Sequence, residues 1–386
     1  MGRGAPVGAG GLAGPGVPPA PAGPGGRESA PVKILARYLA ASLGAGVLAV
    51  LFLLTGLFAL FDLANELGDV GRGHYGLYGA LAHVLFSVPG FVHELFPVCV
   101  VVGAVLALAL LGRNNELLAL SGYGLSRRAC ALLLLRSAGL PLAALAVLNG
   151  ELLAPFAERT AREIRAHAAG RDLHSWLGGE LWLRTGNTHV HIGQVVSAGH
   201  IRDVTLYRYG AGQGLQEMVR ARRGWRKPSH WLLEEVETVR FSAAGASRET
   251  QAARQWRLSV SLETLGSTEV PARFLPMTVL FDYARYLAAN RQSSPPHEFA
   301  LWSRLLQPGV ILVMVLLSLP LARLELPGFD VAGKVLAAAF AGIGYQVLAR
   351  AAYRVGTSYG LQPALLAALP LALLAVFCLA LFRRMR

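Results

Sequence analysis

The stretch GRNNELLALSGYGLSRR, residues 112–128, decides how the rest of the chain can fold. Residues 95–111 before it carry no charge, and residues 129–150 after it carry only Arg136. A run of about 20 apolar residues crosses the hydrocarbon layer of a bilayer, so a polar island between two such runs must lie in water beside the membrane. The sequence therefore predicts an α-helical membrane protein with a short loop at this point.

The island itself has the pattern of a short amphipathic helix, over about residues 114–124. Asn114 or Asn115 can cap its start, and Glu116 then falls in the first turn, where the helix dipole favours an anion. The apolar side chains that such a helix cannot bury against itself are Leu117, Leu118 and Leu120. The pattern is typical of a knob that docks a cytoplasmic partner, and an ordinary polar loop stays open as the alternative.

Apolar runs elsewhere predict six membrane-spanning helices. They cover residues 38–61, 91–111, 129–153, 305–322, 335–353 and 363–382. Lys33 and Arg37 precede the first run and three arginines end the chain, which places both termini in the cytoplasm. Residues 76–87 are amphipathic, and the following Pro89-Gly90 predicts a break, so we expect an interfacial elbow before the second span.

The remaining residues divide around these spans. Residues 1–32 are rich in Gly, Pro and Ala and predict a disordered cytoplasmic tail, or a misassigned start codon. Residues 33–153 hold spans one to three, and residues 300–386 hold spans four to six. Residues 154–299 between them predict an all-β domain, a sandwich or jelly roll, flanked by helices at 156–169 and 278–290. Strands are expected at 201–209, 231–241 and 256–260, and three preceding spans place this domain in the periplasm.

Composition and motifs exclude several functions. The net charge of +13 comes from scattered arginines without a basic motif interleaved with aromatics, which argues against nucleic acid. There is no GxxxxGK[ST] motif, so the chain binds no ATP through a P-loop. The three cysteines form no CxxC pair, and His189 and His191 lack a third ligand nearby in sequence. We expect no catalytic centre, no metal site and no resident cofactor.

Several stretches resemble one family of membrane proteins, the lipopolysaccharide-export permeases (YjgP/YjgQ). The segment NELLALSGYGLSR at residues 115–127 resembles their coupling helix. The other similar stretches are FDLANELGD at 61–69, GHY at 73–75, SVP at 87–89, ELFP at 94–97, GELLAP at 150–155 and LWSRLLQP at 301–308. The resemblance runs from about residue 33 to the C-terminus, and the forms of the coupling segment and of residues 67–75 are similar to the G-type branch rather than the F-type.

This resemblance implies the permease subunit of an ABC-type transporter that takes lipopolysaccharide from the inner membrane and passes it toward the outer membrane. It implies three partners: an F-type permease paralogue, a cytoplasmic ATPase dimer that binds the ATP, and a single-span periplasmic bridge protein. The expected contacts with the ATPase are Asn115, Glu116, Leu117 and Leu120. A permease for another lipid or lipoprotein and a membrane-anchored periplasmic scaffold without transport both stay open.

Arginines at membrane boundaries are the candidate contacts for lipid phosphates. Arg162 and Arg165 are three apart on a predicted helix and share a face, and the arginine fork suits phosphate. The resemblance implies a lipid A contact at this helix, and interfacial anchoring is the alternative. Arg350 and Arg354, one turn apart, are predicted to lie at the same membrane height.

An acidic stripe at the end of the first span argues against phosphate binding there. Asp62, Glu66 and Asp69 follow helical spacing. Such a stripe would repel a phosphorylated lipid unless divalent cations bridged the two or a basic partner neutralised it. We therefore expect Asp62→Ala combined with Glu66→Ala to be tolerated, and Arg162→Glu combined with Arg165→Glu to abolish lipopolysaccharide crosslinking and export.

Overall fold

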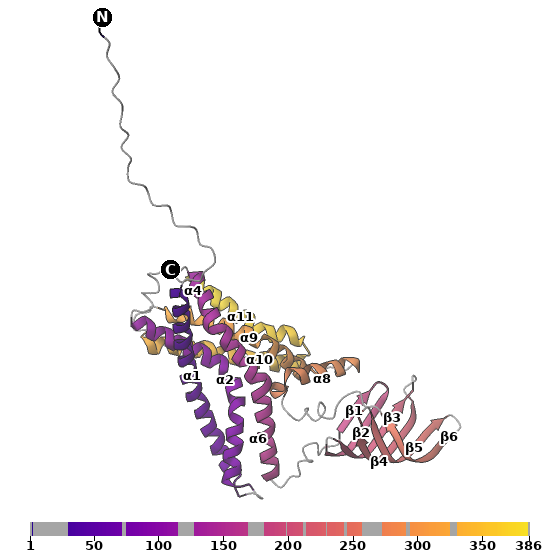
Figure 1. The fold of residues 1–386 in the computed structure, drawn as a ribbon. Helices are drawn as coiled ribbons and strands as arrows, with labels where there is room; N and C mark the ends of the chain where they lie inside the picture. Colours follow the sequence, from indigo (N-terminus) through magenta and orange to yellow (C-terminus); the bar gives the residue numbers. More distant parts are fainter. Residues whose placement is uncertain are drawn as a thin grey trace.

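The computed structural model describes residues 2, 30–71, 75–114, 127–168, 181–197, 199–210, 214–228, 230–242, 245–256, 272–290, 294–324 and 330–384. A helical body carries a β lobe at one side (Figure 1). Among the described residues, six helical segments are long and apolar enough to cross a membrane. An α-helical membrane protein with six spans and an inserted β domain is therefore confirmed. Most of the predicted disordered tail and all of the coupling helix after Asn114 lie outside the described residues, while residues 30–32, which we placed in the tail, already belong to the first helix.

The first two spans are long helices that cross closely. They are α1 (Ala30–Leu67) and α2 (Leu77–Arg113). A Cβ on Gly46 would lie 2.4 Å from the carbonyl oxygen of Gly103, and a Cβ on Gly103 would lie 2.5 Å from the Cα of Val47. Only glycine allows this approach, and small residues at such crossings let membrane helices pack backbone to backbone.

The predicted elbow before the second span is wrong. The helix α2 runs unbroken from Leu77 to Arg113, with Pro89 and Pro97 inside it. Polar side chains contact the helix near Pro89: Asn149 donates to the carbonyl of Pro89 at 3.1 Å, and Ser87 donates to the carbonyl of His83 at 3.0 Å. Prolines are tolerated in spans where such donors and packed helices surround them, and α2 is the most buried span of the body.

The third span continues without a break into the charged helix that we predicted as separate. The segments in order are α4 (Arg127–Leu134), η1 (Leu135–Gly139), α5 (Leu140–Leu148), η2 (Asn149–Leu153) and α6 (Ala154–Ala168). Two of them, η1 and η2, are single π-helical turns. A π-turn widens a helix locally and is frequent at functional positions.

The last three spans complete the body. They are α9 (Pro295–Ala322), α10 (Val331–Tyr359) and α11 (Pro363–Arg384). The core between the spans is built from aliphatic side chains of α1, α2, α9 and the third span, among them Leu43, Val100, Ile311 and Met314, all at most 1% exposed. The start of α1 and the end of α11 lie at the same end of the body (Figure 1), as an even number of spans requires.

The β lobe is one antiparallel sheet with its strands in simple chain order. The strands are β1 (Leu181–Thr185), β2 (Thr188–Ser197), β3 (His200–Tyr209), β4 (Leu215–Arg226), β5 (Trp231–Ser242) and β6 (Gly245–Trp256). The predicted strands 201–209 and 231–241 are confirmed as β3 and β5. The described strands form one sheet, so within the described residues the predicted sandwich or jelly roll, which needs two packed sheets, is not seen. Of the strand expected at 256–260, only Trp256 is described, at the end of β6.

A helix before the fourth span covers one face of this sheet. It is α8 (Met277–Ala289), which confirms the helix expected at 278–290 and follows the short 3-10 turn η5 (Ala272–Phe274). Tyr286 and Leu287 of α8 join the sheet's core with Ile192, Ile201 and Leu233. At the β1–β2 turn, the amide of Gly186 donates to the Asn290 side chain at 2.9 Å.

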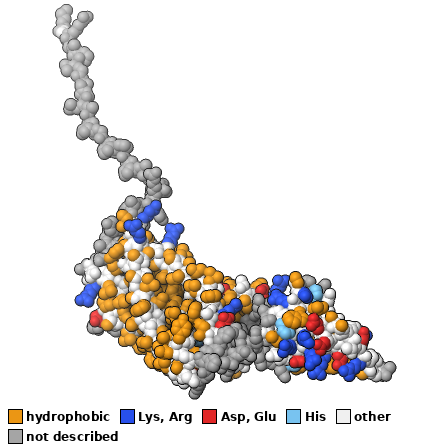
Figure 2. Space-filling view, turned by 60° about the horizontal axis from the view of Figure 1, so that its bottom comes forward, with side chains coloured by type: hydrophobic (Ala, Val, Ile, Leu, Met, Phe, Trp, Pro, Cys, Tyr) orange, Lys and Arg blue, Asp and Glu red, His pale blue; other side chains and the backbone are white. Residues whose placement is uncertain are grey.

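The surfaces of the two parts differ in kind. Hydrophobic side chains cover the helical body, whereas lysine, arginine and acidic side chains are mixed over the β lobe (Figure 2). In the most apolar 18-residue segment of each span, only 17% of the residues of α1 and 11% of those of α10 are buried, against 78% for α2. The helices α1 and α10 thus present their apolar faces outward.

Candidate functional site

The acidic stripe at the end of the first span is the centre of a polar cluster. Glu66 is 4% exposed and accepts a hydrogen bond of 2.6 Å from the Tyr75 hydroxyl. Burial, together with this bond to the charged Glu66, raises the pKa of Tyr75 well above its usual value, so the hydroxyl keeps its proton and donates. The Nε2 atom of His83 lies 3.7 Å from the same carboxylate, and its Nδ1 atom lies 2.9 Å from the carbonyl of Ala161. Three helices therefore meet around one carboxylate.

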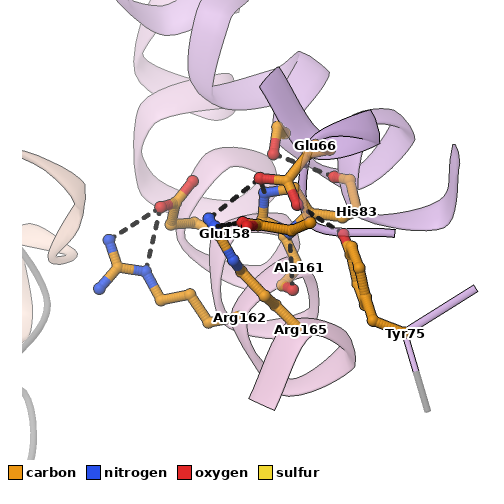
Figure 3. Close-up of polar contacts among 9 residues, drawn as sticks. Glu66, Tyr75, His83, Glu158, Ala161, Arg162 and Arg165 are labelled. Atoms are coloured by element: carbon orange, nitrogen blue, oxygen red, sulfur yellow. Dashed lines mark hydrogen bonds and ion pairs between the residues drawn. The ribbon is translucent and has the colours of Figure 1, made fainter. Parts of the chain in front are cut away.

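Arg165 supplies the positive charge of this cluster. Its Nη1 atom is 3.0 Å from Glu66, and its Nη2 atom is 2.9 Å from Asp69 (Figure 3). One guanidinium thus bridges two carboxylates of the stripe, from a helix almost a hundred residues later in the chain. The acidic stripe could be neutralised by divalent cations or by a basic partner, and the structure shows a basic partner, Arg165.

The stripe consequently does not face lipid at Glu66, and the expectation that alanine there should be tolerated is not supported. A buried carboxylate with a hydroxyl and a guanidinium partner is costly to remove, since its partners lose charge-assisted hydrogen bonds. Tyr75 and His83 were not predicted as parts of a site. The GHY stretch, which carries part of the family resemblance, contains Tyr75, whereas none of the stretches quoted for the resemblance contains His83.

Arg162 has a different environment from Arg165. It makes two hydrogen bonds, of 2.9 and 3.1 Å, to Glu158 one turn earlier in α6. In Figure 3 its side chain extends away from the cluster around Glu66. The predicted pair thus shares a helix, but Arg165 is used inside the protein while Arg162 lies beside it.

Arg350 and Arg354 do not lie at the height of Arg165, contrary to our prediction. Arg350 donates to Glu94 of α2 at 2.5 Å, and Arg354 is exposed one turn further along α10. Eleven residues of α2 separate Glu94 from His83, which is about 16 Å along a helix. From Glu94 to Arg113 is about 28 Å, close to the ~30 Å of the hydrocarbon layer. Along α2, Arg350 therefore lies about three turns nearer to Arg113 than the Glu66 cluster does.

The remaining predicted positions show no further site among the described residues. The coupling residues Asn115, Glu116, Leu117 and Leu120 lie outside the described residues. His191 contacts the Trp182 ring at 4.6 Å, and His189 packs edge-on to Tyr209. Within the described part of the chain, no group of three or more His, Cys, Asp or Glu side chains could hold a metal ion.

Comparison with known proteins agrees with this architecture. Residues 37–384 match the family model of the lipopolysaccharide export system permeases LptF/LptG. The chain belongs to this family. The LptF/LptG match covers all six spans and the β lobe together, so the long outer helices and the inserted sheet are parts of one family architecture.

Curated LptF/LptG members show the branch. The Escherichia coli K12 permease protein LptG is 28% identical over 92% of this chain and 99% of its own length. The LptG of Haemophilus influenzae is 24% identical over 88% of this chain and 94% of its own length. These relatives carry the G-type name, as the coupling segment and residues 67–75 predicted. The relatives are permease proteins rather than enzymes.

Proposed function

We propose that this chain is the G-type membrane subunit of a lipopolysaccharide exporter in the inner membrane of a double-membrane bacterium. The single observation that carries the proposal is the family match over residues 37–384 on a chain whose spans and β lobe are both present. Its relatives are named as export permeases for this lipid. The sheet would then stand in the periplasm, at the end of the route out of the membrane.

The outward apolar faces of α1 and α10 support a role as cavity walls. Phe52, Leu53 and Phe61 of α1 are 64–82% exposed, as are Phe340 and Val347 of α10 at 61–69%. Apolar area of this size must face lipid tails or a second subunit. An F-type paralogue facing these helices would enclose a cavity for acyl chains between the two subunits. Narrowing of this cavity would expel the lipid.

Energy in this proposal comes from a cytoplasmic ATPase dimer, since the chain has no P-loop motif. The ATPase would push on Asn115, Glu116, Leu117 and Leu120 of the coupling segment. A single-span bridge protein would receive the lipid at the periplasmic sheet. This chain would supply walls and a lever, with no cofactor of its own.

For the lipid phosphates, we propose Arg162, Arg350 and Arg354. About 28 Å of α2 separates its partner Glu94 from Arg113, so Arg350 would lie near the outer edge of the apolar layer, where phosphates of an outer-leaflet lipid are found, and its side chain is 68% exposed beside Glu94. Arginine can donate two hydrogen bonds to one phosphate. Arg165, with two carboxylate partners, would act by holding α6 against α1 rather than by binding lipid.

The test uses affinity-tagged full-length chain purified from its native membrane. We expect it to bring down an ATP-binding protein and a paralogue of itself, and photo-crosslinkers at Phe52 to capture lipopolysaccharide. Glu116→Lys should abolish export and ATPase co-purification while the chain stays inserted, with Glu116→Gln as the milder control. Normal export in Glu116→Lys would exclude the lever role of this residue.

Two outcomes would favour the alternatives. Capture of a different lipid at Phe52 would indicate a permease for another lipid or lipoprotein. A chain that co-purifies with neither an ATPase nor a paralogue would be a membrane-anchored scaffold. Orientation is tested separately, since a cysteine at Ser121 should react only from the cytoplasm and one at Gly212 only from the periplasm.

A further inference from the structure

The fourth span contains a buried arginine that the proposed mechanism does not use. Arg304 of α9 lies in the LWSRLLQP stretch, and its side chain is 5% exposed. Its Nη1 atom donates to Glu151 at 3.0 Å and to the carbonyl of Gly150, both in the π-turn η2 of the third span. Its Nη2 atom donates to the carbonyl of Arg273 at 2.9 Å, in η5. One guanidinium therefore joins the third span, the fourth span and the segment that returns from the sheet.

Glu151 extends this junction to α8. While one of its carboxylate oxygens accepts from Arg304, the other accepts from the backbone amide of Met277 at 2.7 Å. Met277 is the first residue of α8, where unpaired amides and the helix dipole favour a carboxylate. The ion pair thus fixes the start of α8 to the two spans.

Packing around the junction leaves no room for movement. A Cβ on Gly150 would lie 2.9 Å from the His93 ring and 3.2 Å from Arg304. Leu275 and Leu280, at most 1% exposed, pack with Ala300 of α9 in a small separate core. The first half of α8 is therefore held by charge, hydrogen bonds and apolar contacts together.

The other end of α8 is fixed to the sheet. Tyr286 donates to the carbonyl of Arg184 at 2.7 Å, and Asn290 accepts from the amide of Gly186 at 2.9 Å. Leu287 is buried in the core of the sheet. With 13 residues, α8 is about 20 Å long, so it forms a strut between the spans and the β lobe.

The geometry points to Arg304 and Glu151 as positioning residues that transmit movement of the third and fourth spans through α8 to the β lobe. This inference rests on the proposed function, because the movement would carry lipid from the cavity to the sheet. The two sequence stretches involved, residues 150–155 and 301–308, are about 150 residues apart in the chain and meet at this junction. Arg304→Lys keeps the charge but cannot reach three acceptors in two directions.

The experiment measures the position of the β lobe directly. Spin labels at Arg222 of β4 and Leu365 of α11, both exposed, report the distance between lobe and body in the full chain in lipid nanodiscs. We expect the distance distribution to widen at least twofold in Arg304→Lys, and likewise in Asn290→Ala at the far end of the strut. The control Arg248→Lys alters an ion pair with Glu237 inside the sheet and should leave the distance distribution unchanged. An unchanged distribution in Arg304→Lys overturns the inference.

Lipid crosslinking separates transmission from simple destabilisation. Photo-crosslinkers are placed at Phe52 of α1 and at Trp182 of β1. In Arg304→Lys, the yield of lipopolysaccharide crosslinked at Phe52 should stay unchanged, and the yield at Trp182 should fall at least fivefold. Parallel loss of both crosslinks would refute a role in transmission. If Arg304→Lys fails to accumulate, Glu151→Gln replaces it, since its amide oxygen still accepts from Met277. If the unaltered chain gives no lipopolysaccharide crosslink at either site, the proposed function is wrong. The spin-label distances still test whether Arg304 and α8 hold the β lobe in place.

Discussion

Replacing Arg165 by glutamine should destabilise the outer ends of the first three spans, whereas the same change at Arg162 should not. Arg165 contacts Glu66, whose side chain is 5% exposed, and a hydrogen bond to a charged group contributes about 1.5–3 kcal/mol. Because the Arg165 side chain is itself 49% exposed, solvent screening reduces this to ~1–2 kcal/mol. The pair with Asp69 is at the surface and adds at most ~1 kcal/mol.

For Arg162, the expected loss is much smaller. Its pair with Glu158 joins positions four apart on one helix, and such pairs contribute about 0.3–0.5 kcal/mol. The two substitutions remove the same charge and the same side-chain type from one helix, so each controls for the other. The difference between them should be roughly 0.5–2.5 kcal/mol.

Thermal unfolding of the full chain in detergent, followed by tryptophan emission, gives the assay. In a chain of 386 residues, a loss of ~1–3 kcal/mol should lower the Tm by about 1–4 °C in Arg165→Gln, and the smaller loss in Arg162→Gln should lower it by under about 1 °C. Lipopolysaccharide crosslinking should fall in Arg162→Gln without a change of Tm. Equal shifts of Tm in the two variants would refute the assignment of Arg165 to the Glu66 cluster.

Two further predictions concern the sheet and the first helix crossing. Burial acts to raise the pKa of the Glu217 carboxyl, but Arg254 at 3.1 Å and Arg208 at 3.0 Å, with Arg240 nearby, outweigh it and hold the pKa below its usual value. A depressed pKa stabilises the fold above the unfolded-state pKa and loses that contribution as pH falls through the folded-state pKa. The Tm difference between the unaltered chain and Glu217→Gln should therefore be fully present at pH 7 and shrink as pH falls from about 4 through the depressed folded-state pKa; a constant difference would contradict it. Gly46→Ala should lower the Tm by several degrees, because its methyl group would meet backbone of α2, while Gly44→Ala, with nothing within 4 Å, should not. Similar Tm values for both alanine variants would show that the crossing is loose.

The spans and the division into body and lobe could be predicted from the sequence because their signals are local. An apolar run of spanning length is a property of consecutive residues. Turn residues such as Gly186-Asn187 likewise indicate the end of a strand at their own position in the sequence. The family could be predicted for the same reason, since its motifs are short continuous stretches. The predicted bounds were wrong where tertiary packing overrode local preference: Pro89 predicts a break, but α2, packed among the other spans, is continuous through it.

The polar contacts at the outer ends of the spans were decided only by the tertiary structure. Arg165 lies 99 residues after Glu66, and Arg304 lies 153 residues after Glu151, so no spacing along the chain relates them. Arg162 and Arg165 look equivalent on a helical wheel, yet one is bonded within its own helix and the other clamps a different helix. The reason is physical: helical periodicity fixes which face a side chain occupies, but the charge it meets depends on which helix packs there, and that is set by burial and close approach across the whole body.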